Sequence, residues 1–392
     1  MSAAAPPHFA LGEEQQQVQA LVRRVAVERV APRAAEIDRS GAYPQDMFDL
    51  LRELGLFTLP FPRAYGGSES LLSACLAIEE LGRICYNTAY LLLVQWAPIG
   101  GILAGGTDAQ KQRLLPGLAD GTLRAGFSLT EPQSGSDVSG IRTRATRDGA
   151  GYRLNGGKIW CTNAAVSDFI LVAARTGAET TRGRINFFIV EAGTPGFTIG
   201  RKEDKMGARG VPSSALFFED AYVPADNMLG NEGEGFKTVM QALNASRPLI
   251  AARGVGLAQG ALDLAADFIR DRRAFGSAVA DFQGVRWMIA DMAIAVAAAR
   301  ELTYRAAALA DAGTTGPVMA RAAAIAKCFA SDTAMKVATD AVQLFGAAGI
   351  SNEYPINRYF RDAKVLQIIE GTNQIQRNII ARTILGPEGG RP

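Results

Sequence analysis

One stretch of the sequence places a carboxylate where it could act as a base. Residues 362–377 form an apolar helical run that ends at Glu370 and Gly371, before a second amphipathic run begins. Two isoleucines precede Glu370, so we expect little water around its side chain; this raises a carboxylate's pKa and suits a general base. Gly371 lets a ligand approach the backbone closely. On this stretch alone, a solvated glutamate at a helix end is the simpler interpretation.

Composition limits the kinds of protein to consider. The chain has 392 residues, of which 48% are hydrophobic and 20% charged, with a net charge of +2. This length predicts two or three domains, and the charge favours neither nucleic acid nor an anionic membrane as a partner. The longest apolar stretch, residues 88–106, is broken by Pro98 and several glycines, which indicates a core helix rather than a membrane span. Residues 1–10 lack a basic region followed by an apolar one, so we expect no export signal.

The rare side chains exclude several chemistries. His8 is the single histidine, which argues against Ser/His/Asp or Cys/His catalysis and against a zinc site; we expect no metal. The cysteines form no CxxC pair and are typical of reduced, mostly buried thiols in a cytoplasmic protein. They are Cys75, Cys85, Cys161 and Cys328. No side chain accepts hydride, so a proton-and-hydride reaction would need a cofactor.

Hydrophobic periodicity divides the chain into three regions. Residues 1–122 show helical spacing, residues 123–234 carry short strand-like runs between glycine turns, and residues 235–392 return to long, Ala-rich helices. The predicted fold class is therefore α+β with several domains. We expect a helical N-terminal domain, a middle β barrel or sandwich domain, and a C-terminal helix bundle.

Glycine and proline locate the breaks between elements. Pro98 should kink or end a helix over residues 88–103, Asp148-Gly149 predicts a hairpin, and residues 155–157 predict another turn. The expected strands are residues 141–145, 152–154, 169–174, 185–191, 197–199 and 215–218. The expected C-terminal helices are residues 236–246, 249–272, 283–312, 318–344 and 374–385.

Three further motifs could bind a ligand. Residues 130–137 place hydroxyls and backbone amides after a strand, where they can face a flavin edge or a phosphate. Trp160 and Thr162 lie two apart on a strand and so share a face, on which an indole can cover an aromatic ring system. Arg272 and Arg273 suit a pyrophosphate, which a guanidinium binds bidentately. The simpler interpretations are a polar turn, a half-buried tryptophan and a solvated basic turn.

Together these motifs resemble the acyl-CoA dehydrogenase family. The matching segments, in the family's order, are residues 130–137, 158–163, 272–276, 343–346 and 369–377. The resemblance covers nearly the whole chain and implies an α, β, α domain order that ends in a four-helix bundle. It also implies FAD, an acyl-CoA or acyl-carrier thioester substrate, fatty acid metabolism, a homotetramer built as a dimer of dimers, and an electron-transfer flavoprotein as the electron acceptor.

The resemblance also implies roles for individual residues. Glu370 would remove the α proton while a hydride leaves the β carbon for the flavin N5. The Glu370 amide and a ribityl hydroxyl of FAD would stabilise the developing enolate. Arg272 and Gln283 would reach FAD across a subunit interface. Residues implied to bind FAD are Leu129, Thr130, Gly135, Ser136, Trp160, Thr162, Arg272, Phe275, Gln283, Gln343, Leu344, Gly346, Ala347, Thr372 and Gln374. Residues implied to bind the substrate are Ser136, Asn244, Arg247 and Gly371.

The sequence departs from the family pattern in places. Asn244 stands where the family usually has Asp beside the arginine that matches Arg247, which leaves a carrier-protein thioester open beside free CoA. Ala347 stands where the family often has glycine, and Ile369 where it often has tyrosine. The alternatives on the same fold are a flavin oxidase, a desulfinase and a carrier-protein-linked acyl dehydrogenase. A non-catalytic helical scaffold protein is the alternative of another class.

Trp96 carries a hypothesis about substrate size. The resemblance places the helix that begins near Thr88 beside the acyl pocket, and an indole at Trp96 would shorten that pocket and favour short or branched acyl groups. The simpler interpretation is that Trp96 packs in the helical core.

Overall fold

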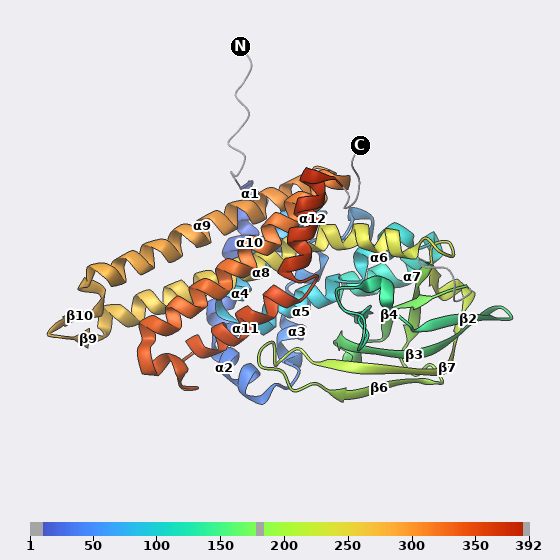
Figure 1. Cartoon of the computed structure of the whole chain (residues 1–392), viewed down its shortest axis with the longest axis horizontal. Helices are drawn as coiled ribbons and strands as arrows, with labels where there is room; N and C mark the ends of the chain where they lie inside the picture. The colour runs from blue at the N-terminus through green and yellow to red at the C-terminus, as the bar shows by residue number, and fades with distance from the viewer. Residues whose placement is uncertain (1–10, 178–183, 387–392) are drawn as a thin grey trace, which may run out of the picture.

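Figure 1 shows the computed structural model of the chain, with helices at both ends of the sequence and a sheet between them. The structure describes residues 11–177 and 184–386, and within these the backbone alone of residues 236–245. The predicted fold class is confirmed: a helical N-terminal domain, a middle sheet domain and a helical C-terminal domain. The sheet lies at one end of the long axis in Figure 1, and the C-terminal helices extend to the other end.

The N-terminal helices bury the apolar faces that the sequence predicted. Pro98 ends α5, so the predicted helix over residues 88–103 is two helices, α5 and α6. Gly55 has a φ of 67° and closes α3 in the left-handed region. The helices are α1 Glu13–Val25, α2 Ala31–Ser40, α3 Gln45–Glu53, α4 Leu71–Ile84, α5 Tyr86–Trp96, α6 Ile99–Gly105 and α7 Asp108–Ala119. A π-helical turn, Ala26–Val30, joins α1 to α2.

The middle domain forms one eight-stranded sheet, ordered β6-β7-β3-β2-β4-β5-β8, with β1 paired in parallel to β4. Its strands are β1 Ala125–Ser128, β2 Arg144–Asp148, β3 Gly151–Thr162, β4 Phe169–Arg175, β5 Ile185–Glu191, β6 Phe197–Lys202, β7 Ser213–Pro224 and β8 Met228–Leu229. The β4 strand is apolar from Phe169 to Ala174 because both of its faces are buried there. Leu171 packs in the core shared with the helices, whereas Val172 packs in a second core within the sheet domain.

One turn prediction in this domain is wrong. The hairpin at residues 148–151 is confirmed, with Asp148 paired to Gly151. Residues 155–157, however, lie inside β3, where the pairing with β7 shifts register between Leu154 and Gly156. Gly156 has a φ of 136°, and a Cβ there would lie 2.8 Å from the Cα of Thr143. The two glycines therefore serve a β-bulge and a close strand approach rather than a chain reversal.

The C-terminal domain contains the longest helices. These are α8 Gly235–Asp271, α9 Gln283–Asp311, α10 Gly316–Phe345, α11 Ile356–Ile368 and α12 Asn373–Leu385. A short hairpin of β9 Arg273–Ala274 and β10 Ser277–Ala278 joins α8 to α9. The predicted break between residues 246 and 249 is wrong, because Pro248 lies inside α8. An internal proline costs about 3 kcal/mol, which the apolar burial of α8 between α4 and α10 offsets.

Two helical segments are long and apolar enough to cross a membrane, Tyr86–Gly105 and Ser246–Asp271. They are 72% and 78% buried inside the protein, as core helices are. Close packing of α8 on α4 explains the glycine at position 256, because a Cβ at Gly256 would lie 2.2 Å from the Glu79 carbonyl oxygen of α4. The four cysteines are unpaired and buried, as expected.

Candidate active site

Glu370 lies in a tight turn between α11 and α12. The α11 helix ends at Ile368, and Thr372 caps α12 by accepting a hydrogen bond from the Ile375 amide at 3.3 Å. Glu370 has a φ of 55° and Gly371 a φ of 84°, so two successive residues are left-handed. A left-handed glutamate is strained by about 1–3 kcal/mol, and such strain is concentrated at functional sites.

Hydrogen bonds from buried side chains hold this turn. The Gly371 carbonyl accepts from Lys327 Nζ and from Gln376 Nε2, both at 2.9 Å, and Gln376 Nε2 also reaches the Glu370 carbonyl at 3.2 Å. Lys327 Nζ donates a further bond of 2.9 Å to Asn373 Oδ1. Lys327 and Gln376 thus clamp the turn. A Cβ at Gly371 would lie 2.8 Å from Gln376 Nε2, so only glycine fits there without displacing this clamp.

Asp332 on α10 ties the neighbouring helices together. Its carboxylate accepts from Asn373 Nδ2 at 2.6 Å, from Gln367 Nε2 at 2.7 Å and from Arg377 Nη2 at 2.7 Å. Burial by itself would raise the pKa of Asp332, but these hydrogen bonds outweigh it and lower that pKa. Asp332 and Lys327 are functional candidates that the sequence did not predict. The available signal was a lysine within the Ala-rich residues 322–330, where a buried helix face is otherwise apolar.

The environment of Glu370 supports the role of a base. Burial raises the pKa of its carboxyl group, and the nearby charges of Arg247, Arg253 and Lys327 act in the opposite direction. Arg247 and Lys327 are themselves buried, and burial lowers the pKa of Lys327 to about 8. A carboxylate with a raised pKa accepts a proton more readily than a solvated one.

A second group of predicted residues lies on the sheet domain. Residues 129–136 follow β1, and the buried Glu131 within them binds Lys158 Nζ of β3 at 2.6 Å. Burial lowers the pKa of Lys158 to about 8, and Lys158 and hydrogen bonds keep that of Glu131 below its usual value, so both are charged at pH 7. This ion pair, which sequence reasoning missed, fixes the loop while Gly135 and Ser136 stay exposed.

Trp160 and Thr162 lie at the end of β3 as predicted. Cys161 between them is buried, so it faces the opposite way. Trp160 has a φ of 60° and sits at a register shift between Lys158 and Cys161, which turns its indole outward. The indole is 52% exposed, a large apolar surface for a β domain.

A third group of predicted residues lies at the opposite end of the molecule. Arg272, Phe275 and Gln283 surround the β9–β10 hairpin, and Phe275 is 97% exposed. Phe345 at the end of α10 stacks on Phe268 of α8 at 4.1 Å, which brings the last part of α10 to this same end. That part carries the remaining predicted FAD residues of this group, Gln343, Leu344, Gly346 and Ala347. Figure 1 places the hairpin far from the sheet along the long axis.

Of the remaining predicted residues, some lie in the turn, one lies in the helical core, and one has a side chain outside the described residues. Thr372 and Gln374 lie at the start of α12, next to Glu370. The Asn244 side chain lies outside the described residues. Trp96 is buried, and its Nε1 donates to the Phe57 carbonyl at 2.7 Å, so it packs in the helical core as the simpler interpretation holds.

Comparison with known proteins identifies the family. Models described as the N-terminal, middle and C-terminal domains of acyl-CoA dehydrogenases match residues 12–122, 126–221 and 233–385. The chain therefore belongs to the acyl-CoA dehydrogenase family, a family of FAD-dependent oxidoreductases.

Individual relatives are similar over almost their full length. The chain is 46% identical to the cyclohex-1-ene-1-carbonyl-CoA dehydrogenase of Geobacter metallireducens, over 96% of this chain and 99% of that protein. It matches the structure of butyryl-CoA dehydrogenase from Megasphaera elsdenii with a TM-score of 0.92 and 41% identity, over 96% and 99% of the two chains. A chain in a structure described as the electron transferring flavoprotein of Acidaminococcus fermentans matches with a TM-score of 0.93 and 41% identity, over 97% and 100%.

The residues present fit FAD. The outward indole of Trp160 offers a surface for the ring system, and Thr130 and Ser136 offer hydroxyls beside it. The exposed Arg272 supplies a guanidinium of the kind that binds pyrophosphate. The FAD complex of PigA is a further structural neighbour, with a TM-score of 0.90 and 28% identity over 96% and 99% of the two chains.

The Lys327 clamp yields a first prediction. Lys327→Met should lower kcat about 10- to 100-fold with a smaller change in KM, because the Gly371 carbonyl and Asn373 lose a charged donor and the turn loosens. Steady-state kinetics on acyl-CoA, with FAD content measured alongside, tests this. Lys336→Met is the matched control, since Lys336 lies on the same helix but is exposed and paired only with Asp340. An unchanged kcat in Lys327→Met would show that the clamp has no part in the reaction.

Proposed function

We propose that this chain catalyses the α,β-dehydrogenation of an acyl thioester, with Glu370 as the base that removes the α proton. The observation that carries the proposal is the Glu370 carboxyl group, which lies on a clamped left-handed turn with a raised pKa. When bound, FAD supplies the acceptor for the hydride that leaves the β carbon. The names of the related dehydrogenases support an acyl-CoA as the substrate.

The α proton of a thioester is too weakly acidic for a carboxylate alone, so the thioester oxygen needs hydrogen bonds as charge develops on it. The backbone N–H of Glu370 donates to no acceptor in the part of the chain that the structure describes. It lies on the residue that carries the base, so one turn supplies both the base and a donor for the oxyanion. This arrangement supports a concerted role for the Glu370 backbone and side chain.

The same proposal extends to the electron acceptor and the location. The structural similarity to a chain described with an electron transferring flavoprotein supports such a flavoprotein as the partner that reoxidises FAD. The four unpaired, buried thiols support a cytoplasmic location.

Glu370→Gln tests the role of the base. The variant keeps the size and polarity of the side chain but cannot accept the proton, so turnover should fall by at least about 100- to 10,000-fold while FAD stays bound. Substrate binding, followed as a shift of the flavin spectrum, should persist. Glu353→Gln is a control, because Glu353 is exposed and distant in the fold from the turn. Near wild-type turnover in Glu370→Gln would remove Glu370 from the role.

The raised pKa of Glu370 predicts the acidic limb of the pH profile. Only the deprotonated carboxylate accepts the proton, so kcat/KM should fall as pH drops through this pKa. Burial moves that fall to a higher pH than the ordinary range of a glutamate. The measurement is kcat/KM against pH with a dye acceptor, and a profile flat down to pH 4 would contradict the assignment.

We propose further that the FAD site is completed by a second copy of the chain, in a dimer or a dimer of dimers. The β9–β10 hairpin, which carries one group of the predicted FAD residues, lies at the end of the long axis opposite the sheet in Figure 1, and this separation supports a site shared between two chains. Exposed apolar side chains support such contacts. Among them are Phe275, Trp287, Ile294, Ile350, Ile384 and Leu385.

Assembly and flavin content should therefore change together. Sedimentation equilibrium of the flavin-loaded protein should give a dimer or tetramer, and Phe275→Asp should lose FAD without a lower melting temperature of the folded chain. The reason is that Phe275 is almost fully exposed and contacts only the ring of Phe282 among the aromatic side chains of the described residues. Val27→Asp, an exposed apolar position on the N-terminal helices, is the control. A monomer that retains FAD would contradict the shared site.

A further inference from the structure

Arg253 on α8 is a buried cation without a hydrogen-bonding partner. Its side chain is fully buried, and none of its three guanidinium nitrogens meets an acceptor in the part of the chain that the structure describes. A buried charge is stable only when it is paired or hydrogen-bonded. The position therefore calls for an anion that the chain itself does not provide.

Two tyrosines of α5 surround this guanidinium. The Arg253 Cζ atom lies 3.8 Å from the ring centroid of Tyr90 and 4.4 Å from that of Tyr86. Stacking of this kind stabilises the cation but leaves the N–H groups at the edge of the guanidinium without acceptors. The Tyr86 hydroxyl is also buried and makes no hydrogen bond within the described residues. Adjacent elements thus present two groups that can donate hydrogen bonds and that the described residues leave unused.

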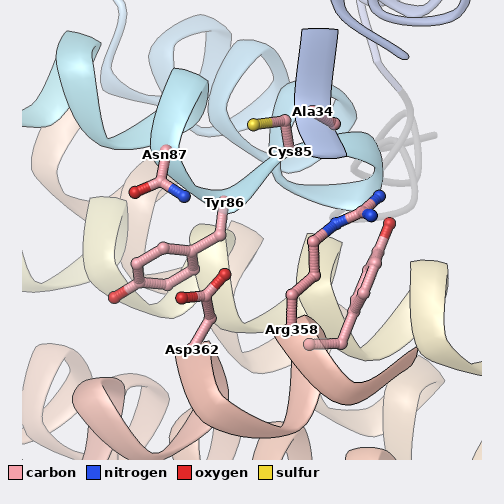
Figure 2. Close-up of a pocket in the computed structure, with 7 residues that line it drawn as sticks. Ala34, Cys85, Tyr86, Asn87, Arg358 and Asp362 are labelled. Atoms are coloured by element: carbon pink, nitrogen blue, oxygen red, sulfur yellow. The ribbon is translucent and has the colours of Figure 1, made fainter. Parts of the chain in front are cut away.

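The carboxylates near this cluster have other roles. Asp362 lines a small cavity together with Tyr86, as Figure 2 shows. Its Oδ1 accepts from the Ala208 amide at 2.6 Å, and among the described residues it forms no ion pair with Arg253. The charge of Arg253 lowers the pKa of Glu370, although no hydrogen bond joins the two side chains among the described residues. Three cations, Arg247, Arg253 and Lys327, act on the Glu370 carboxyl group, and Asp332 is engaged by Asn373, Gln367 and Arg377. A further negative charge near Arg253 is therefore favoured.

We propose that Arg253 and the Tyr86 hydroxyl bind a carboxylate at the far end of the acyl chain, so that the preferred substrate is the thioester of a dicarboxylic acid. This inference rests on the proposed dehydrogenation. Arg253 is fully buried, Glu370 is half-buried, and the Arg253 charge acts on the Glu370 carboxyl group. In this proposal the acyl chain passes Glu370 and its far end meets Arg253. A guanidinium fork matches a carboxylate bidentately, and the tyrosine hydroxyl adds a third bond.

The same donors discriminate against plain alkyl chains. An alkyl end placed against Arg253 would leave the guanidinium and the Tyr86 hydroxyl buried without acceptors. A site built to hydrogen-bond a polar group rejects the analogue that lacks it far more strongly than an apolar pocket rejects a longer chain. Within residues 11–177 and 184–386, Arg253 has no hydrogen bond or ion pair that an incoming carboxylate would first have to break.

The test uses the FAD-loaded protein and matched pairs of CoA thioesters that differ only at the far end of the acyl chain. The pairs are succinyl-CoA with butyryl-CoA, glutaryl-CoA with pentanoyl-CoA, and adipyl-CoA with hexanoyl-CoA. For at least one pair, kcat/KM with a dye acceptor should favour the dicarboxylic member by about 10- to 100-fold, the range expected for a charged hydrogen bond at a buried site. The pair with the largest ratio reports the spacing between Glu370 and Arg253.

Variants separate recognition from folding. Arg253→Met should abolish or reverse the preference within that pair. The two members are compared in each variant at one alkaline pH, because loss of the Arg253 charge also raises the pKa of Glu370 and affects both members alike. Arg253→Lys, which keeps the charge but loses the fork, should give an intermediate ratio. Tyr86→Phe removes one hydroxyl and should reduce the ratio several-fold without affecting the alkyl member. Arg270→Met, an exposed position near the end of α8, is the matched control and should change nothing.

The outcomes distinguish this inference from the proposed function. Preference for the alkyl member in every pair would overturn the inference and leave the dehydrogenase function intact, as would an equal loss on both members in Arg253→Met. Failure to oxidise any thioester of either kind would instead overturn the proposed function.

Discussion

The bond between Lys327 and the Gly371 carbonyl is the contact on which the candidate site depends. It joins the long, buried α10 to a turn of two left-handed residues, and the same ammonium group also binds Asn373 at the start of α12. A turn of this kind is strained, and an exposed loop would relax it. Here, the buried donors Lys327 and Gln376 hold the backbone of the turn, so Glu370 keeps its place although its side chain makes no hydrogen bond within the described residues.

The low dielectric of the helical core changes the pKa of the Glu370 carboxyl group. Glu370 lies beside cations from α8 and α10, and these buried charges interact more strongly than they would in water. Burial raises the pKa of the carboxyl group, whereas the cations limit that rise. The balance leaves the pKa of Glu370 above its ordinary value and the surroundings of Arg253 positive.

All three domains contribute to the position of the turn. The segment between β6 and β7 donates the Ala208 amide to Asp362 of α11 at 2.6 Å and the Gly210 amide to Asn87 of α5 at 3.0 Å. Arg361 of α11 pairs with Asp38 of α2. The helix that leads to Glu370 is therefore held by contacts from the N-terminal helices and from the sheet domain.

The sequence by itself determined the class of fold, because it depends on local patterns, and it singled out Glu370 as the candidate base. Helical and strand periodicities separate the three domains, and an apolar helix that ends in Glu370-Gly371 marks a partly desolvated carboxylate. The hairpin at residues 148–151 followed from the turn preferences of Asp and Gly. The motif that contains Trp160 and Thr162 also placed these side chains on the strand where they lie.

Only the tertiary structure decided the features that depend on neighbours distant in the sequence. Pro248 stays within α8 because packing on both sides outweighs the lost hydrogen bond, and residues 155–157 form a bulge because β2 and β7 lie alongside. From the sequence alone, Lys327 and Arg253 would be expected to be solvated charges. Their roles appear only when folding buries them, since a charge removed from water must find a partner, and the partners available depend on which helices meet.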